Sequence, residues 1–450
     1  MNTLDSRCAA IQDKLAASFD LVFRHVHIEQ TEAWAIFLSS LTDSKMIAEI
    51  IESMVITGSK GLSVTFYPGS VDAITDLHKA ILQILSGQCV VIIAGDEKYY
   101  CIETRQYPSR QTAEPSVEKS IRGSHDGFVE NIILNVGLLR RRIRDPRLRI
   151  ILNKEGVKTR TDIAYAYIEK LVDPDILQDF ENRLLNLDET EILSERNLCE
   201  ELYGKTMNPY PHVRYTERPD ICSIHLLQGY LVVVVDNSPT AMIIPTTFFE
   251  QTKQIEEYTQ TPLIACFTRI IRLIGIFFSL YLIPLWIVIN VTHNPTMLAI
   301  PLLEIKPAEF AFQILFADIV VEWIRQALIH TPTVLSGIMG FIAVFLLGDT
   351  AVELGATTKE ILAMIALVNI GNLITPSYEL SLANKAFRIL IGALSLLFGL
   401  KGFCLGIFLH ILILMSTKTV KYPYLYPFLP FSYKALKKIF FGSPIQIKKP

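Results

Sequence analysis

The feature that most constrains this chain is a run of nineteen residues without a charge, Leu273–Val291. A helix of about 20 apolar residues, rising 1.5 Å per residue, crosses the roughly 30 Å hydrocarbon core of a bilayer. Arg269 and Arg272 precede the run, and basic flanks are typical of the cytoplasmic end of a membrane helix. The sequence therefore predicts that part of this chain is embedded in a membrane.

Three further apolar segments follow this run: Thr333–Gly348, Ile361–Thr375 and Ile389–Met415. The last is either one long tilted helix or a hairpin folded at residues 399–402. The tail beyond it carries seven lysines and no acid, so we expect it to be cytoplasmic. Two ends on one side require an even number of crossings. We expect four, with Pro307–His330 as an additional helix that does not cross as an ordinary lipid-facing span.

The charge of the chain divides at about residue 262. Up to Pro262 there are 27 basic and 37 acidic residues, a net charge of −10, and the remainder has 15 basic and 8 acidic residues, a net of +7, which together give −3. Met1–Leu15 contains no apolar run that would form a signal peptide, so we expect the front half to stay in the cytosol. Its acidity argues against nucleic acid as a partner.

The front half contains one α/β unit twice. An apolar strand precedes a capped helix at Ala33–Leu38 and again at Ile163–Ile168, and later a helix ends at Gly87 or Gly229 before a β-hairpin. We therefore predict two small repeated α/β lobes followed by a polytopic α-helical membrane bundle. The predicted divisions are a first lobe (1–110), an inter-lobe linker and helix (111–146), a second lobe (147–260), a transmembrane domain (261–417) and a basic cytoplasmic tail (418–450).

The helix between the lobes ends in a cluster of arginines. Six arginines fall between residues 140 and 149. The candidates for an inter-lobe basic patch are Arg140, Arg141, Arg142 and Arg144. Such a patch either binds anionic lipid headgroups or an acidic partner, or forms a hinge whose arginines pair with the acidic lobes.

Charged side chains also occur inside the apolar half. Asp318, Glu322 and Arg325 are spaced at i, i+4 and i+7 and fall on one stripe of the helix Pro307–His330. A charge at membrane depth costs at least about 2.5–3.5 kcal/mol, so it faces a partner or water. The stripe either lines an ion path or forms a salt-bridged helix at an interface. Further pore-lining candidates are Asn369, Asn372 and Glu379, whereas Lys385 and Arg388 fit the predicted topology poorly.

The sequence contains no complete catalytic motif among those considered. Gly204-Lys205-Thr206 resembles the end of a P-loop, but the first glycine of that motif is replaced by Cys199. The seven cysteines are scattered and form no CxxC pair. We expect the chain not to be an enzyme and to hold neither a cofactor nor a metal.

Several sequence blocks resemble the GerA family, the A subunits of the germinant receptors of bacterial spores. These blocks include Gly127-Phe128 with Glu130, the run 135–143, Thr216–Asp220 and Pro245–Phe249. Two C-terminal blocks, Thr375–Asn384 and Pro423–Phe431, look most like the branch of the family that travels with the SpoVA proteins. The resemblance covers about residues 20 to 430.

The resemblance implies a spore inner-membrane protein that acts in germination, with its lobes and tail facing the cytoplasm (the spore core). A subunits of this family are thought to oligomerise around an ion-conducting pore. The favoured hypothesis is an oligomeric channel subunit that releases monovalent cations, with membrane lipids and other germination proteins (receptor B/C-type or SpoVA) as partners. The alternatives are a non-conducting receptor or scaffold subunit, and an accessory to SpoVA-type dipicolinic acid transport.

Overall fold

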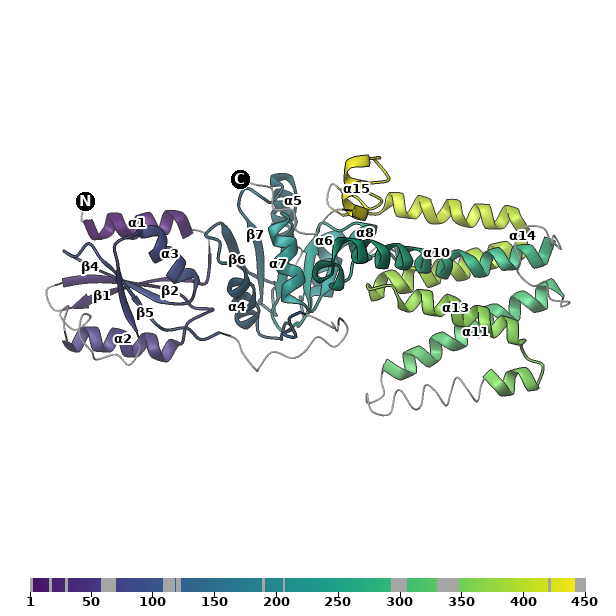
Figure 1. Ribbon diagram of the computed structural model, residues 1–450, viewed down its shortest axis with the longest axis horizontal. Coiled ribbons are helices and arrows are strands. Elements are labelled where there is room, and N and C mark those ends of the chain that lie inside the picture. Colours follow the sequence, from purple (N-terminus) through teal and green to yellow (C-terminus); the bar gives the residue numbers. More distant parts are fainter. Residues whose placement is uncertain are drawn as a thin grey trace.

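The computed structural model describes residues 3–15, 18–28, 31–57, 70–107, 118, 123–187, 191–204, 207–292, 306–329, 348–419 and 422–441. Two lobes and a helical region follow one another along the long axis of the molecule, as Figure 1 shows.

The first lobe is a sheet covered by helices on both faces. Its five antiparallel strands lie in the order β1-β2-β4-β5-β3. Helices α1 and α3 pack on one face and α2 packs on the other. Its elements are α1 (Thr3–Leu15), β1 (Leu21–Ile28), β2 (Thr31–Leu38), α2 (Ser44–Thr57), β3 (Val71–Ile74), α3 (Leu77–Leu85), β4 (Cys89–Ile93) and β5 (Tyr99–Ile102).

The second lobe repeats this arrangement strand for strand, in the order β6-β7-β9-β10-β8. Helices α4 and α7 cover one face, and α5 and α6 cover the other. The predicted repeat of two small lobes is therefore confirmed, and the structure shows that each is built on an antiparallel sheet. Its elements are α4 (Ile132–Arg142), β6 (Leu148–Glu155), β7 (Thr161–Ile168), α5 (Pro174–Leu185), α6 (Glu195–Tyr203), β8 (Arg214–Thr216), α7 (Pro219–Leu227), β9 (Leu231–Val235) and β10 (Ala241–Ile244).

The local sequence explains these elements. Strand β9 reads Leu-Val-Val-Val-Val and is buried throughout, as expected for a strand covered on both faces. Asp173 caps α5 by accepting a hydrogen bond from the backbone N–H of Asp175, and Pro174 occupies the first turn, where its missing N–H costs nothing. Helix α4 buries Val136, Leu138 and Leu139 in the core of the second lobe. It therefore belongs to that lobe, not to a separate linker.

The glycine that precedes the hairpin has the same role in both lobes. Gly87 and Gly229 have φ values of +89° and +91°, where L side chains are strained. A Cβ at Gly87 would lie 2.9 Å from the carbonyl oxygen of Leu41, and one at Gly229 would lie 2.4 Å from that of Leu171. The glycine thus lets the helix pack closely on the loop that follows β2 or β7.

Gly229→Ala is expected to destabilise the second lobe by about 2–4 kcal/mol, because left-handed strain and a backbone clash add together. Gly204→Ala is the matched control, since Gly204 has φ +82° with nothing within 4 Å of its Cβ position. Thermal unfolding of the purified full chain, followed by near-ultraviolet circular dichroism, measures the difference. Equal losses in the two variants would contradict the close packing at Gly229.

The inter-lobe arginines bind the lobes to each other. Arg140 donates from Nη2 to Asp20 Oδ1 at 2.9 Å and from Nε to Asp20 Oδ2 at 3.1 Å, and both residues are buried. Arg142 pairs with Asp126 at 2.5 Å. The guanidinium of Arg141 lies over the ring of Tyr107, and Arg144 donates to its hydroxyl. Because Asp20 and Tyr107 belong to the first lobe, the geometry supports the hinge interpretation over an unpartnered basic patch.

The helical region follows the second lobe. Helix α10 leads away from the lobe, and α11 runs antiparallel to it, as the contact of Phe310 with Trp286 indicates. The close approach of Gly371 to Gly275 brings α13 against α10. The elements are α8 (Phe248–Gln251), α9 (Glu256–Thr259), α10 (Pro262–Thr292), α11 (Pro307–Ile329), α13 (Lys359–Leu373), α14 (Tyr378–Ser416), β11 (Lys418–Thr419), β12 (Tyr422–Pro423) and α15 (Tyr433–Phe441).

Helix α14 is a hairpin folded at Gly399, which decides between the two predicted forms. Gly399 has a non-helical φ of 57° and ψ of −136°. Across the fold, Gly406 packs on Ile391, and the rings of Phe387 and His410 lie 4.9 Å apart. The arms 378–398 and 400–416 are about 30 Å and about 25 Å long at 1.5 Å per residue.

By length and composition, two helical segments in the described part of the chain could cross a membrane: Pro262–Val291 of α10, and Tyr378–Ser416, which is the α14 hairpin. They contain the predicted spans Leu273–Val291 and Ile389–Met415. The predicted span Ile361–Thr375 coincides largely with the shorter helix α13. The predicted span Thr333–Gly348 lies outside the described residues except for Gly348, so the expected four crossings stay a prediction.

Candidate functional site

The candidate site is a group of charged side chains between α11 and α14. We call it the charge cluster, and it consists of Asp318, Glu322 and Arg325 on α11 with Lys385 and Arg388 on α14. At its centre, Arg388 donates to both oxygens of Asp318, from Nη2 at 2.7 Å and from Nε at 3.0 Å. Both side chains are 0% exposed. The cluster therefore contains a bidentate ion pair that is completely buried.

Lys385 links the two acids of the cluster. Its Nζ lies 3.0 Å from Glu322 Oε2 and 3.6 Å from Asp318 Oδ1. Glu322 also accepts from Arg325 Nη2 at 2.6 Å, and the Arg325 guanidinium lies over the ring of Tyr378. With three basic and two acidic groups the cluster carries a formal charge of +1. Lys385 is thus a cation placed between two competing carboxylates.

The cluster also reaches α10 and α13. Arg388 Nη1 donates to the carbonyl oxygen of Ser279 on α10 at 2.8 Å. Asn369 on α13 donates from Nδ2 to Asp318 Oδ1 at 3.2 Å. Four helices consequently meet at one buried polar centre. A change in the ion pairs of this centre would therefore alter the packing of all four helices.

The structure brings together four of the six predicted pore-lining candidates: Asp318, Glu322, Arg325 and Asn369. Asn372 is buried on α13, and its side-chain oxygen has no hydrogen-bond partner among the described residues. Glu379 lies in the first turn of α14 and accepts a hydrogen bond from Ser377 Oγ at 3.3 Å. Sequence reasoning missed Lys385 and Arg388 as partners, although their i, i+3 spacing in an apolar helix was a usable signal.

The apolar surroundings of the charge cluster make the burial of its charges energetically costly. Large apolar side chains are exposed along the outer faces of the same helices, among them Phe277 and Phe278 on α10 and Leu397 and Phe398 on α14. Water-soluble proteins rarely expose a continuous apolar surface of this kind. A buried ion pair gains little net stability, because desolvation of its charges offsets their attraction, but loss of one partner is strongly destabilising.

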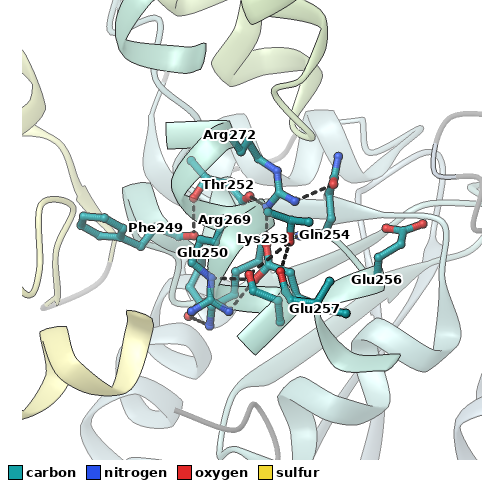
Figure 2. Close-up of polar contacts among 12 residues, drawn as sticks. Phe249, Glu250, Thr252, Lys253, Gln254, Glu256, Glu257, Arg269 and Arg272 are labelled. Carbon is teal, nitrogen blue, oxygen red and sulfur yellow. Dashed lines mark hydrogen bonds and ion pairs between the residues drawn. The ribbon is translucent and has the colours of Figure 1, made fainter. Parts of the chain in front are cut away.

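A second polar group joins the second lobe to α10, and Figure 2 shows it. Glu257 in α9 accepts from Arg269 Nε at 2.8 Å and also pairs with Arg272. Arg272 donates as well to the carbonyl oxygen of Thr252 and to the side chain of Gln254. Glu257, Arg269 and Arg272 are all buried. The two arginines that marked a cytoplasmic flank in the sequence therefore attach α10 to the lobe.

The neighbouring helix α8 holds a buried carboxylate. Glu250 pairs with Lys253 at 2.5 Å and lies 3.2 Å from Nε2 of His225. Burial alone would raise the pKa of Glu250, but Lys253 and the hydrogen bond with His225 hold that pKa well below its ordinary value. Glu250 is therefore ionised at neutral pH and paired with Lys253.

A third contact joins the lobe to the hairpin of α14. The Tyr210 hydroxyl, from a loop of the second lobe, lies 2.7 Å from His410 Nε2 and 3.3 Å from Asn384 Oδ1. The other ring nitrogen of His410 lies 2.7 Å from the Tyr281 hydroxyl on α10. Tyr210 thereby contacts both arms of the hairpin. Movement of the second lobe would be transmitted directly to α14.

No group of three or more histidine, cysteine or acidic side chains suited to a metal ion occurs within the residues that the structure describes.

Comparison with known proteins agrees with the resemblance noted in the sequence. The family described as "Bacillus/Clostridium GerA spore germination protein" matches residues 9–450. The chain belongs to the GerA family. This GerA-family chain is 36% identical over 438 residues to "Stage V sporulation protein AF" of Bacillus subtilis (strain 168), covering 94% of the chain and 89% of that protein. The branch predicted from the C-terminal blocks is that of this relative.

Two further matches have a lower identity to this GerA-family chain. It is 26% identical over 460 residues to "Spore germination protein KA" of Bacillus subtilis (strain 168), covering 98% of the chain and 85% of that protein. The crystal structure of the N-terminal domain of the A subunit of the Bacillus megaterium spore germinant receptor GerK3 aligns with a TM-score of 0.43 and 24% identity, covering 55% of this chain and 96% of that domain.

Proposed function

We propose that this chain is a subunit of an oligomeric ion channel in the inner membrane of the spore, which releases monovalent cations during germination. Family membership supports a role in spore germination. In this proposal the helical region crosses the bilayer and the two lobes face the spore core. The charge cluster holds the helices in their closed arrangement.

The apolar exterior of the helical region supports the placement in a membrane. Helix α10 exposes large apolar side chains from Leu263 to Phe278, and α14 exposes them from Leu390 to Met415; the arms of the α14 hairpin approach bilayer thickness. Lipid would cover these side chains without requiring any further protein partner. The charged groups, by contrast, are turned inward and paired, which is the arrangement expected of ionisable groups inside a membrane.

The single observation that carries the gating proposal is the position of Lys385 between two acids. Buried charges that find a partner in two arrangements form a two-state element, because each arrangement is stable and the intermediate is not. Moving Lys385 fully to Asp318 would release Glu322, still paired with Arg325, from α14; these two residues are the more exposed members of the cluster. Their release would place a carboxylate and water between α11 and α14.

Lys385→Met is expected to raise cation leakage at least several-fold over wild type, because it removes the Glu322–Lys385 link between α11 and α14 but leaves the Asp318–Arg388 link intact. The measurement is potassium and sodium flux from proteoliposomes that contain equal amounts of the purified chain. Asp179→Asn is the control, since it breaks only the half-exposed pair with Arg183 on α5.

The same proteoliposomes discriminate the alternatives. A chain that conducts nothing in either form would contradict the channel and favour a non-conducting receptor or scaffold subunit. Selective release of dipicolinic acid, without cation flux, would instead favour an accessory to SpoVA-type transport. Flux that is raised equally by Lys385→Met and Asp179→Asn would contradict the assignment of gating to the charge cluster.

A further inference from the structure

The C-terminal helix α15 combines exposed lysines with exposed aromatic side chains. Lys434 and Lys437 lie one turn apart on the same face, and both are exposed. Phe431, just before the helix, and Tyr433, its first residue, are each exposed by 67%. A short amphipathic helix with lysines on one side and aromatic residues beside them is the pattern of a segment that lies at a membrane surface.

The position of α15 matches that pattern. The backbone N–H of Phe248 donates to the carbonyl oxygen of Tyr424, and the rings of Phe249 and Phe428 lie 5.3 Å apart, which fixes the C-terminal segment to α8. Helix α15 contacts α10 and lies at the boundary between the second lobe and the long helices (Figure 1). The exposed apolar face of α10 begins at this boundary, with Leu263 exposed by 81%.

The C-terminal tail that contains α15 carries lysines and no acidic residue. The sequence contains no acidic residue after Glu379. Within the described parts of the chain, neither Lys434 nor Lys437 forms an ion pair. Each lysine near an anionic lipid surface strengthens binding to that surface about five-fold. Two lysines together therefore strengthen binding roughly 25-fold.

We propose that α15 and the preceding residues 428–432 lie on the bilayer surface and bind anionic phospholipid headgroups through Lys434 and Lys437. Phe431 and Tyr433 insert at the boundary between headgroups and acyl chains. This contact anchors the base of the second lobe to the membrane, beside the point where α10 leaves the lobe. The inference rests on the proposed membrane insertion of the helical region.

The test uses the full chain in nanodiscs, with bimane attached to a cysteine at position 433 (Tyr433→Cys) after Cys404, the exposed native cysteine, is replaced by serine. Quenching by brominated lipid measures how close the label is to the acyl chains. We expect stronger quenching with phosphatidylglycerol than with phosphatidylcholine alone, and a loss of that difference at high salt. Lys434→Glu/Lys437→Glu should abolish the difference in quenching between the two lipids, because it weakens docking of α15 on the anionic surface at least about 25-fold.

Two controls separate this inference from the proposed function. Lys45→Glu/Lys79→Glu makes the same change of charge on exposed lysines of the first lobe and should leave the quenching unchanged. A second label at position 277 (Phe277→Cys on α10) reports membrane insertion itself. Strong quenching at 277 with none at 433, or equal quenching at 433 in both lipids, would overturn the headgroup site alone. Absence of quenching at 277 would overturn the membrane insertion on which the site depends.

Discussion

Arg388→Met is expected to lower the free energy of unfolding of the helical region by about 3–5 kcal/mol, because it leaves the Asp318 carboxylate buried without its main partner. Asp318 has no solvent exposure, and both of its oxygens accept from Arg388. The loss should appear as a lower unfolding temperature of the helical region in detergent, measured by the fluorescence of the tryptophans. Trp286 and Trp323 lie in that region.

The matched control for this prediction removes both charges. Asp318→Leu/Arg388→Met replaces the ion pair with apolar side chains of similar size, and such replacements are often neutral or stabilising. The double variant should therefore recover most of the stability lost in Arg388→Met. If the double variant were as unstable as the single one, the loss of stability would come from the shape of the pair or from the hydrogen bond between Arg388 and Ser279. It would then not come from the unpaired charge, which would contradict the prediction.

Glu257→Gln is expected to weaken the attachment of α10 to the second lobe by about 3–5 kcal/mol, because two buried arginines lose their shared carboxylate. Arg269 and Arg272 both pair with Glu257, and the three side chains are almost without solvent exposure. The expected result is cleavage between residues 257 and 272 by a protease that does not cut the wild-type chain. The lobes themselves should keep their unfolding temperature.

Glu256→Gln provides the control within the same short helix. The Glu256 side chain is half-buried and points away from the arginines (Figure 2). This variant should resist the protease as wild type does. Equal sensitivity of the Glu256 and Glu257 variants would indicate that removal of any acid loosens α9, and would contradict the role assigned to the shared carboxylate.

The repeated lobes could be predicted because their signals are local. Strand, capped helix, glycine and hairpin recur in the same order, and the glycines at 87 and 229 are required by positive φ and close packing. The order of strands in each sheet was not predicted, since it depends on which strands pair across the chain. The sequence predicts α4 as an inter-lobe helix, and only the packing of its apolar residues shows that it belongs to the second lobe.

The candidate site was predictable only in part, for a similar reason. The spacing of Asp318, Glu322 and Arg325 correctly indicates one stripe of a helix, but a stripe does not reveal what faces it. Lys385 and Arg388 become partners only when α14 packs against α11. Likewise, residues 399–402 are compatible with a straight helix or a hairpin, and the contact of Gly406 with Ile391 shows which one forms.

The most direct test of the account is single-channel recording from the full chain in a planar bilayer, wild type against Lys385→Met. The account predicts stepwise currents carried by monovalent cations, with a higher open probability in the variant. An absence of current from both proteins, once fluorescence has shown that each is incorporated in the bilayer, would contradict it.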